Sequence, residues 1–365
     1  MHTFTNRIPY APSGLLTQEL FTEKALFYDI ETTGFSAKFH KIYFIGCAYQ
    51  RGGQLLVTQL FSETAEDEGE VLCAFLHLCE EFDSTISFNG LMFDLPFIRQ
   101  RCQALGIPEK LSEMAHLDIY RQAKPLKHLL KLESLKQKSI EAFLGIDRED
   151  QYDGGRLIPI YQAYQQDRNP EKLRLLKLHN YEDVLGMIDL LPILAYGKLM
   201  EGCFTVTGHD VRECREYDGS TSMELFFTLL LTYPLPKRIS YGQEDVYLVA
   251  DGSRACLRVK LFCGELKHFY PNYRDYYYLP QEDMAVHKSV AAYVDSEFRV
   301  KAKAETCYCK KSGCFLPQYQ ELLTPSFQAD HRDKHSYAEL TEEFAASNEL
   351  KKAYAKHLLQ HAISS

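Results

Sequence analysis

The stretch that most constrains the fold is an apolar run with two acids, Leu26 to Gly34 (Leu-Phe-Tyr-Asp-Ile-Glu-Thr-Thr-Gly). On a β-strand, side chains two residues apart point to the same face, so Asp29 and Glu31 would place their carboxylates side by side. Such a pair repels itself unless one acid is protonated or a cation lies nearby. Clustered oxygen ligands favour hard divalent ions. The stretch therefore predicts half of a metal site at a strand end. The alternative is a solvated turn, because Thr33 and Gly34 are ordinary residues for a strand exit.

Length and composition predict a soluble globular protein of two domains. The chain has 365 residues, of which 45% are hydrophobic and 25% are charged. These fractions are ordinary for a globular protein, and the length exceeds one average domain. The longest apolar runs stay well short of the roughly 20 residues that a membrane span needs, and residues 1–10 lack the apolar core of a secretory signal. We therefore expect a cytoplasmic protein with no membrane partner.

Net charge and cysteine content indicate how the protein would bind a polyanion and which compartment it suits. The net charge of -9 argues against a protein that coats nucleic acid by bulk electrostatics, so a polyanion would be bound locally, through metal or a restricted patch. The cysteines number 11, and Cys47, Cys73, Cys79 and Cys102 fall within apolar patterns, where a thiol acts as a small hydrophobe. We expect reduced thiols, which fit the cytoplasm.

Hydrophobic patterns divide the chain into an irregular lead-in (1–24), a first domain (25–200) and a second domain (201–365). The first domain begins with strands at 25–30, 41–48 and 54–60, an antiparallel meander in which Gly52-Gly53 joins the last two. Helices at 66–82 and 95–105 then alternate with short strands at 84–88 and 116–119, and residues 120–194 are mostly helical. The predicted class is α/β, with a mixed sheet flanked by helices.

The second domain is predicted to be a smaller β-rich α+β domain of unknown function. We expect strands at 246–249, 255–262, 268–270 and 289–295, tyrosine-rich turns at 273–278 and a closing helix at 337–363. Its many aromatic residues either form its core or stack on bases beside basic residues that contact phosphates. Those basic residues are Arg299, Lys301, Lys303, Lys310 and Lys311.

Two further acidic motifs follow in the first domain. Asp94 comes after a bend at Asn89-Gly90 and starts a helix whose first turn suits Pro96. It is either a metal ligand or a helix N-cap. On a later helix, His179 and Asp183 are four residues apart and share a face, which sets a proton acceptor beside a possible metal ligand. A core or surface histidine is the usual alternative.

The three motifs in order, Asp-Ile-Glu-Thr-Thr-Gly, Asn-Gly-x-x-Phe-Asp and His-Asn-x-x-Asp-Val, resemble those of the DEDD 3′–5′ exonucleases of the ribonuclease-H-like superfamily. Within that group they are most similar to the YprB-like predicted nuclease domains. The resemblance covers about residues 25–195, including Asp118 at the place of an Asp-Thr-Leu-like strand end. It implies a ribonuclease-H-like fold that binds two Mg²⁺ or Mn²⁺ ions. The ligands that it implies are Asp29, Glu31, Asp94 and Asp183.

One departure from the family's pattern concerns the group that activates water. The tyrosine subclass has a tyrosine four residues before the last Asp, and another subclass has a histidine five before it. This chain has His179 at the tyrosine's position and Tyr181 two residues before Asp183. We expect His179 to take the role, because a histidine titrates near neutrality and accepts the proton directly.

The expected function is that of a metal-dependent 3′–5′ exonuclease, which hydrolyses phosphodiester bonds by a two-metal mechanism, with nucleic acid (DNA or RNA, single-stranded or at 3′ ends) as the partner. Two alternatives remain: a structure-specific endonuclease with the same carboxylates, and a nucleic-acid-binding or scaffolding protein with an inactive site. The complete set of carboxylates argues against the last.

Two other groups have weaker interpretations. A basic run either grips phosphates or forms a solvated helix face; it comprises Arg121, Lys124, Lys127, His128, Lys131, Lys136 and Lys138. Cys307, Cys309 and Cys314 suggest zinc, but their Cys-x-Cys-x4-Cys spacing lacks the usual Cys-x2-Cys pair and an obvious fourth ligand.

Overall fold

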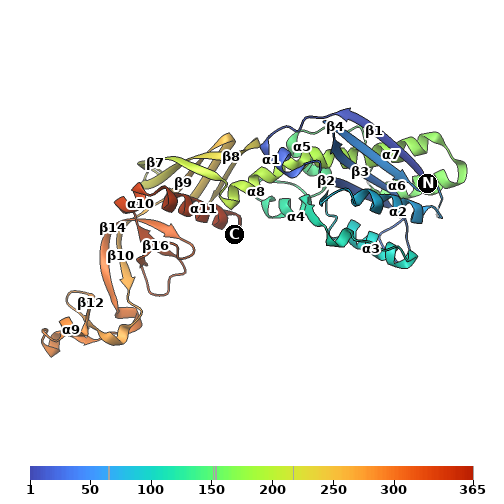
Figure 1. Cartoon of the computed structure of the whole chain (residues 1–365). Helices are drawn as coiled ribbons and strands as arrows, with labels where there is room; N and C mark the ends of the chain where they lie inside the picture. Colours follow the sequence, from blue (N-terminus) through green and yellow to red (C-terminus); the bar gives the residue numbers. More distant parts are fainter. Residues whose placement is uncertain (65, 151, 153, 217, 365) are drawn as a thin grey trace. The chain divides into compact units, whose positions relative to one another are not determined.

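The computed structural model describes residues 1–64, 66–150, 152, 154–216 and 218–364 (Figure 1). The chain divides into two compact units, each with its own internal contacts. The first unit comprises Met1–Lys198 and Tyr233–Lys237, and the second comprises Leu199–Thr232 and Arg238–Ser365.

The first unit is built on a six-stranded mixed sheet in the order β1-β4-β3-β2-β5-β6. Its strands are β1 His2–Pro9, β2 Ala25–Thr32, β3 Ile42–Arg51, β4 Gln54–Phe61, β5 Ser84–Ser87 and β6 Ala115–Asp118. Strands β2, β3 and β4 form the predicted antiparallel meander, whereas β5 and β6 add to β2 in parallel. Gly52 and Gly53 make the β3–β4 turn with φ of 57° and 73°, a conformation that glycine adopts without strain.

The lead-in at residues 1–24 is not irregular, as the sequence suggested. Strand β1 pairs antiparallel with β4 along its whole length and forms an edge of the sheet, and helix α1 spans Leu15–Leu20. Pro9 and Pro12 indicated a loop, but Pro9 is tolerated because it closes an edge strand.

Helices cover both faces of this sheet. The helices in this part of the chain are α2 Glu68–Cys79, α3 Asp94–Leu105, α4 Ile119–Ala123, α5 Gln137–Leu144, α6 Gly154–Asp167, α7 Pro170–Leu190 and α8 Leu194–Glu201, of which the last three residues belong to the second unit. On one face, Tyr28 and Ile30 of β2 share a core with Phe75 of α2 and Phe97 of α3. On the other face, residues of β3 and β4 pack against α6 and α7. Because successive side chains of a strand alternate between the two faces, Asp29 and Glu31 point away from the core that contains Tyr28 and Ile30.

Helix α7 lies unusually close to β3 at Gly46. A Cβ atom at Gly46 would lie 2.4 Å from Oδ1 of Asn180 and 2.7 Å from Val184, so a larger residue would push the helix away. Gln59 of β4 fixes the same turn of the helix, because its Nε2 donates to Asn180 Oδ1 at 3.0 Å and to the carbonyl of Lys177 at 2.9 Å. These contacts fix the height of α7 above the sheet.

The second unit is β-rich and ends in a helix. Its sheets are β7-β8-β9, β10-β14-β16-β15 and β12-β11-β13. Their strands are β7 Phe204–Arg215, β8 Thr221–Gln243, β9 Val246–Lys260, β10 Phe262–Phe269, β11 Tyr276–Leu279, β12 Met284–His287, β13 Val300–Lys301, β14 Tyr308–Gln318, β15 Ser326–Phe327 and β16 Ser336–Glu339. The helices are α9 Lys288–Ala291, α10 Glu342–Ala346 and α11 Asn348–Ser364. Tyr354 and Leu358 of α11 are fully buried, and the helix contacts β7 and β9.

Three local predictions in this unit are wrong. Residues 276–278 form strand β11 rather than turns, because Tyr277 and Tyr278 pair with both β12 and β13. Residues 288–291 form a short helix, α9, rather than a strand. The closing helix does not start at 337, since Tyr337 pairs in β16, and Thr341 caps α10 by accepting from the backbone N–H of Phe344.

The expectation that all cysteines are reduced is also wrong. Cys263 of β10 and Cys314 of β14 are directly opposite each other in the ladder and form a disulfide. Cys314 is therefore not available to a zinc ion, and the suggested Cys307, Cys309 and Cys314 site loses one of its ligands. Among the residues that the structure describes, no helix is long and apolar enough to cross a membrane.

Candidate functional site

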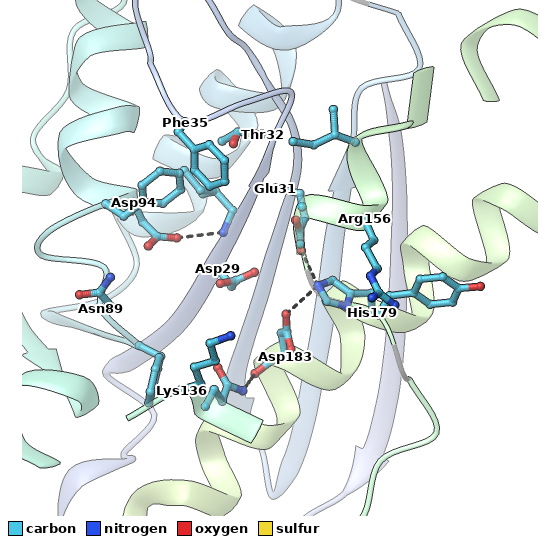
Figure 2. Close-up of a pocket in the computed structure, with 18 of the residues that line it drawn as sticks. Asp29, Glu31, Thr32, Phe35, Asn89, Asp94, Lys136, Arg156, His179 and Asp183 are labelled. Carbon is cyan, nitrogen blue, oxygen red and sulfur yellow. Dashed lines mark hydrogen bonds and ion pairs between the residues drawn. The ribbon is translucent and has the colours of Figure 1, made fainter. Parts of the chain in front are cut away.

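The candidate site opens at the end of β2, where Asp29 and Glu31 point to one side of the sheet. Both line a cavity of about 610 Å³, as the strand period predicts for residues two apart (Figure 2). Glu31 is 7% exposed, so its carboxylate lies largely out of water. The cavity thus begins with two acids in a poorly solvated setting.

Asp94 reaches the same cavity from the start of α3. Its Oδ1 accepts a hydrogen bond from the backbone N–H of Ile30 at 3.1 Å, which ties α3 to β2 between the first two acids (Figure 2). The alternative of a helix N-cap does not apply, because Asp94 is the first residue of the helix and Phe93 is at the cap position.

The turn before Asp94 is held by the carboxylate of Asp118, at the end of β6. Asp118 accepts from the backbone N–H groups of Asn89 at 2.9 Å and Leu91 at 3.2 Å. Asn89 has a φ of 63°, which asparagine tolerates better than most residues. Asp118 is 3% exposed, and we assign it a structural part in presenting Asp94.

His179 and Asp183 of α7 close the cavity on the opposite side. His179 Nε2 lies 3.1 Å from Asp183 Oδ2 and 3.3 Å from Glu31 Oε1, so one ring nitrogen faces two acids (Figure 2). The structure thus brings together all five residues that the sequence singled out. Tyr181, the other candidate for the water-activating group, is not among the described residues that line the cavity.

The acids of the cavity have strongly perturbed affinities for protons. Burial, followed by the charges of Asp94 and Glu31, raises the pKa of Asp29 well above its ordinary value. Burial raises the pKa of Asp94 to about 7, although the hydrogen bond from Ile30 opposes the change. Burial also raises the pKa of Glu31, against the nearby His179. Three acids of one cavity therefore resist ionisation in the absence of a cation.

Two cations offset part of this charge. Burial lowers the pKa of His179, but the carboxylates of Asp183 and Glu31 outweigh burial and raise it to about 11. Arg148, whose side chain is 8% exposed, pairs with Asp183 and with Glu141. Burial raises the pKa of Asp183, but His179 and Arg148 outweigh it and lower the pKa. Without a metal, the protonated histidine is the cation between Glu31 and Asp183.

The donor set fits a divalent metal. The ligand atoms of Glu31, His179 and Asp183 all lie within 4.8 Å of one another, and Asp29 and Asp94 line the same cavity. Carboxylate oxygens are the ligands that Mg²⁺ and Mn²⁺ favour. A cation placed here would also remove the cost of several buried acids in one cavity.

Two residues that contact the site, Arg148 and Asp150, belong to none of the sequence motifs. They lie in the segment between α5 and α6, 35 residues from Asp183 and 29 from His179 respectively. Neither residue has a spacing that relates it to α7, so no local signal could have found them. Of the basic run, Lys136 and Lys138 line the cavity. Lys127 is half-buried, and the remaining members of the run are exposed.

The basic residues proposed for nucleic-acid binding in the second unit are partly engaged. Lys310 Nζ lies 2.5 Å from Asp283 Oδ2, and Lys311 Nζ lies 2.6 Å from Glu339 Oε2. Arg299 lies over the ring of Tyr277. Several tyrosines pack around Ala285, Ala302 and Cys307, as the core interpretation expects. Lys301 and Lys303 are exposed.

Residues 26–195 match the family model described as the RNase H superfamily. This part of the chain has an RNase H-like fold. The match ends at α8 and does not extend into the second unit. The RNase H-like region thus contains the whole candidate site, and the finer likeness to YprB-like domains remains a prediction.

Comparison with solved structures gives more distant likenesses. A family B DNA polymerase from the hyperthermophilic archaeon Pyrobaculum calidifontis is 14% identical with a TM-score of 0.36, over 69% of this chain and 35% of that one. Exonuclease I of E. coli in complex with a dT13 oligonucleotide is 14% identical with a TM-score of 0.28, over 56% and 54%. The chain thus spans about a third to a half of the length of these proteins. No curated protein matches the chain.

Proposed function

We propose that the protein is a metal-dependent nuclease that hydrolyses phosphodiester bonds, as a 3′–5′ exonuclease on single-stranded DNA or RNA. The observation that supports this is the convergence of Asp29, Glu31, Asp94 and Asp183 on one cavity of an RNase H-like fold. These four residues would hold two Mg²⁺ or Mn²⁺ ions. When bound, the ions supply a lowered pKa for the attacking water and stabilise the charge on the attacking and leaving oxygens.

The chain's own residues would divide the remaining work. Asp94, held by the backbone of Ile30, and Asp183, held by Arg148, offer oxygens from opposite walls of the cavity. His179 is the proposed group that takes the proton of the attacking water at Nε2, the nitrogen that faces Glu31 and Asp183. With these two acids bound to cations, the proton on Nε2 would lose its stabilising partners and leave, and the freed lone pair of Nε2 would accept a proton from the attacking water.

The walls of the cavity also suit a nucleotide chain. Lys136 and Arg156 line it and would contact phosphate oxygens. Phe35 is 82% exposed at its rim, and Phe93 lines it further in. Aromatic faces of this kind stack on unpaired bases irrespective of sequence, which supports single strands as the substrate.

The test uses the purified full-length protein with Mn²⁺ and two substrates, an end-labelled linear oligonucleotide and a circular single strand. We expect progressive shortening of the linear strand from its 3′ end and an intact circle. Asp29→Asn and Asp183→Asn should each reduce cleavage by about 10³-fold or more, because each removes an oxygen ligand. Asp167→Asn, an exposed position, is the matched control.

The other outcomes separate the alternatives. Cleavage of the circle would replace the exonuclease by an endonuclease, and shortening from the 5′ end would reverse the polarity. Cleavage of neither substrate, with any of Mg²⁺, Mn²⁺ or Zn²⁺, would overturn the proposal in favour of a binding protein. Equal cleavage by the two variants and the wild type would show that another site is responsible.

A further inference from the structure

Asp150 lies directly behind His179, on the side of the ring that faces away from the cavity acids. Its Oδ2 accepts a hydrogen bond from His179 Nδ1 at 2.7 Å. Both side chains are buried, with 6% and 3% of their surfaces exposed. A buried carboxylate accepts hydrogen bonds only, so Nδ1 is the donor in this pair.

The histidine is therefore held at both nitrogens. With Nδ1 on Asp150, the opposite nitrogen Nε2 faces Glu31 Oε1 at 3.3 Å and Asp183 Oδ2 at 3.1 Å. A flip of the ring would break all three contacts.

Asp150 is itself fixed by contacts outside the ring. Its Oδ2 also accepts from Lys138 Nζ at 2.9 Å, and its Oδ1 accepts from the backbone N–H of Tyr152 at 3.0 Å. The carboxylate of Glu182 accepts from the backbone N–H groups of Glu149 at 3.2 Å and Asp150 at 2.9 Å. The segment is thus attached to α7 one turn from His179, and both oxygens of Asp150 are in use.

We propose that Asp150 is a positioning residue, which sets the orientation of the His179 ring so that Nε2 faces Glu31 and Asp183. The inference rests on the proposed nuclease function, because His179 has its role only in that reaction. Asp150 does not face the substrate cavity, so it acts through His179 and not by direct contact with nucleic acid.

The decisive variant is Asp150→Asn, which keeps the shape of the side chain. An amide offers one acceptor oxygen where the carboxylate offers two, so either Tyr152 N–H or the His179 and Lys138 donors would meet an NH₂ group. We expect kcat on the linear oligonucleotide to fall by about 10²-fold, the lower range for loss of general-base assistance, with KM changed by less than about two-fold. Asp147→Asn, at an exposed position of the same segment, is the matched control and should retain kcat.

A double variant separates positioning from a general effect on folding. If Asp150 acts through the ring, Asp150→Asn should add little to the loss caused by His179→Gln. A second variant, Glu182→Gln, leaves Asp150 in place and weakens its backbone support, and it should lower kcat less than Asp150→Asn. Should Asp150→Asn fold poorly, this second variant carries the same comparison with His179→Gln.

A spectroscopic readout requires no cleavage. In the full-length protein with ¹⁵N-labelled histidine, the wild type should show a slowly exchanging, downfield Nδ1 proton that His179→Gln removes and Asp150→Asn shifts or loses. An unchanged resonance in Asp150→Asn, wild-type kcat in that variant, or full additivity with His179→Gln would overturn this role alone. No cleavage by the wild type would overturn the proposed function, and this role with it.

Discussion

At the scale of single residues, the candidate site is a set of acids whose charges are costly until a cation arrives. The pKa of Asp29 lies well above its ordinary value and that of Asp94 is about 7, mainly through burial. An acid with a raised pKa stabilises the folded state while it is protonated, and this contribution is lost as the pH rises through the folded-state pKa. His179 acts in the same direction, because its pKa of about 11 gives a contribution that is complete below pH 6.5 and declines above it.

The metal-free protein should therefore become less stable between pH 5 and pH 8.5. The depressed pKa of Asp183 does not oppose this trend, because its contribution is lost only as the pH falls below 3.8, outside this window. We expect Tm in EDTA to fall by on the order of 5 °C over this range, and Mn²⁺ to raise Tm more at pH 8.5 than at pH 5. Thermal unfolding at both pH values measures this. In the Asp94→Asn variant, Tm should fall less between the two pH values, because one titrating acid is missing. A gain from Mn²⁺ that is equal at both pH values would contradict it.

At the scale of secondary-structure elements, the site depends on how closely α7 approaches the sheet. Gly46→Ala places a Cβ 2.4 Å from Asn180 Oδ1, and the helix that carries His179 and Asp183 must move. We expect a loss of about 1–3 kcal/mol in unfolding free energy, as for other overpacked cores, together with weaker cleavage. Urea denaturation and the linear-oligonucleotide assay measure the two effects.

Gly69→Ala is the matched control for that change, because a Cβ at Gly69 meets nothing within 4 Å. Alanine is the better helix former, so this control should keep or slightly raise stability. If Gly46→Ala behaved like Gly69→Ala in both measurements, the close approach of α7 would not matter to the site.

The elements of the site were accessible to sequence reasoning to different degrees. Strand periodicity and helical spacing predicted that Asp29 pairs with Glu31 and His179 with Asp183, because such contacts follow from local geometry. Asp94 required the resemblance to a family, since β2 and α3 meet only in the folded sheet. Asp150 contacts His179 across 29 residues of chain through an irregular segment, and no periodicity describes such a segment.

At the scale of the whole molecule, different interactions stabilise the two units. The RNase H-like region has a large two-sided core, whereas the β10–β14 ladder of the second unit is pinned by the Cys263–Cys314 disulfide across 51 residues. We propose 25–200 as the nuclease domain and 201–365 as the second domain. The segment Tyr233–Lys237 of β8 belongs to the first unit, where Lys237 Nζ donates to the carbonyl of Phe143 at 3.1 Å.

Removing the disulfide should destabilise the second unit. We expect Cys263→Ser with Cys314→Ser, or treatment of the wild type with dithiothreitol, to lower the unfolding free energy of this unit by about 2–4 kcal/mol, the usual effect of closing a long loop. Calorimetry that resolves two transitions would show a downward shift in one of them. Cys73→Ser, at an exposed free thiol, is the control and should shift neither. A shift of the RNase H-like transition instead would show that the ladder supports the other unit.

The way in which Asp118 holds the Asn89–Leu91 turn has a practical consequence. Both hydrogen bonds go to main-chain N–H groups, and Met92, the next residue, is 77% exposed. The loop's shape is thus nearly independent of that side chain. Position 92 is a natural place to attach a fluorophore, because a new side chain there should leave the backbone that presents Asp94, two residues later, unchanged.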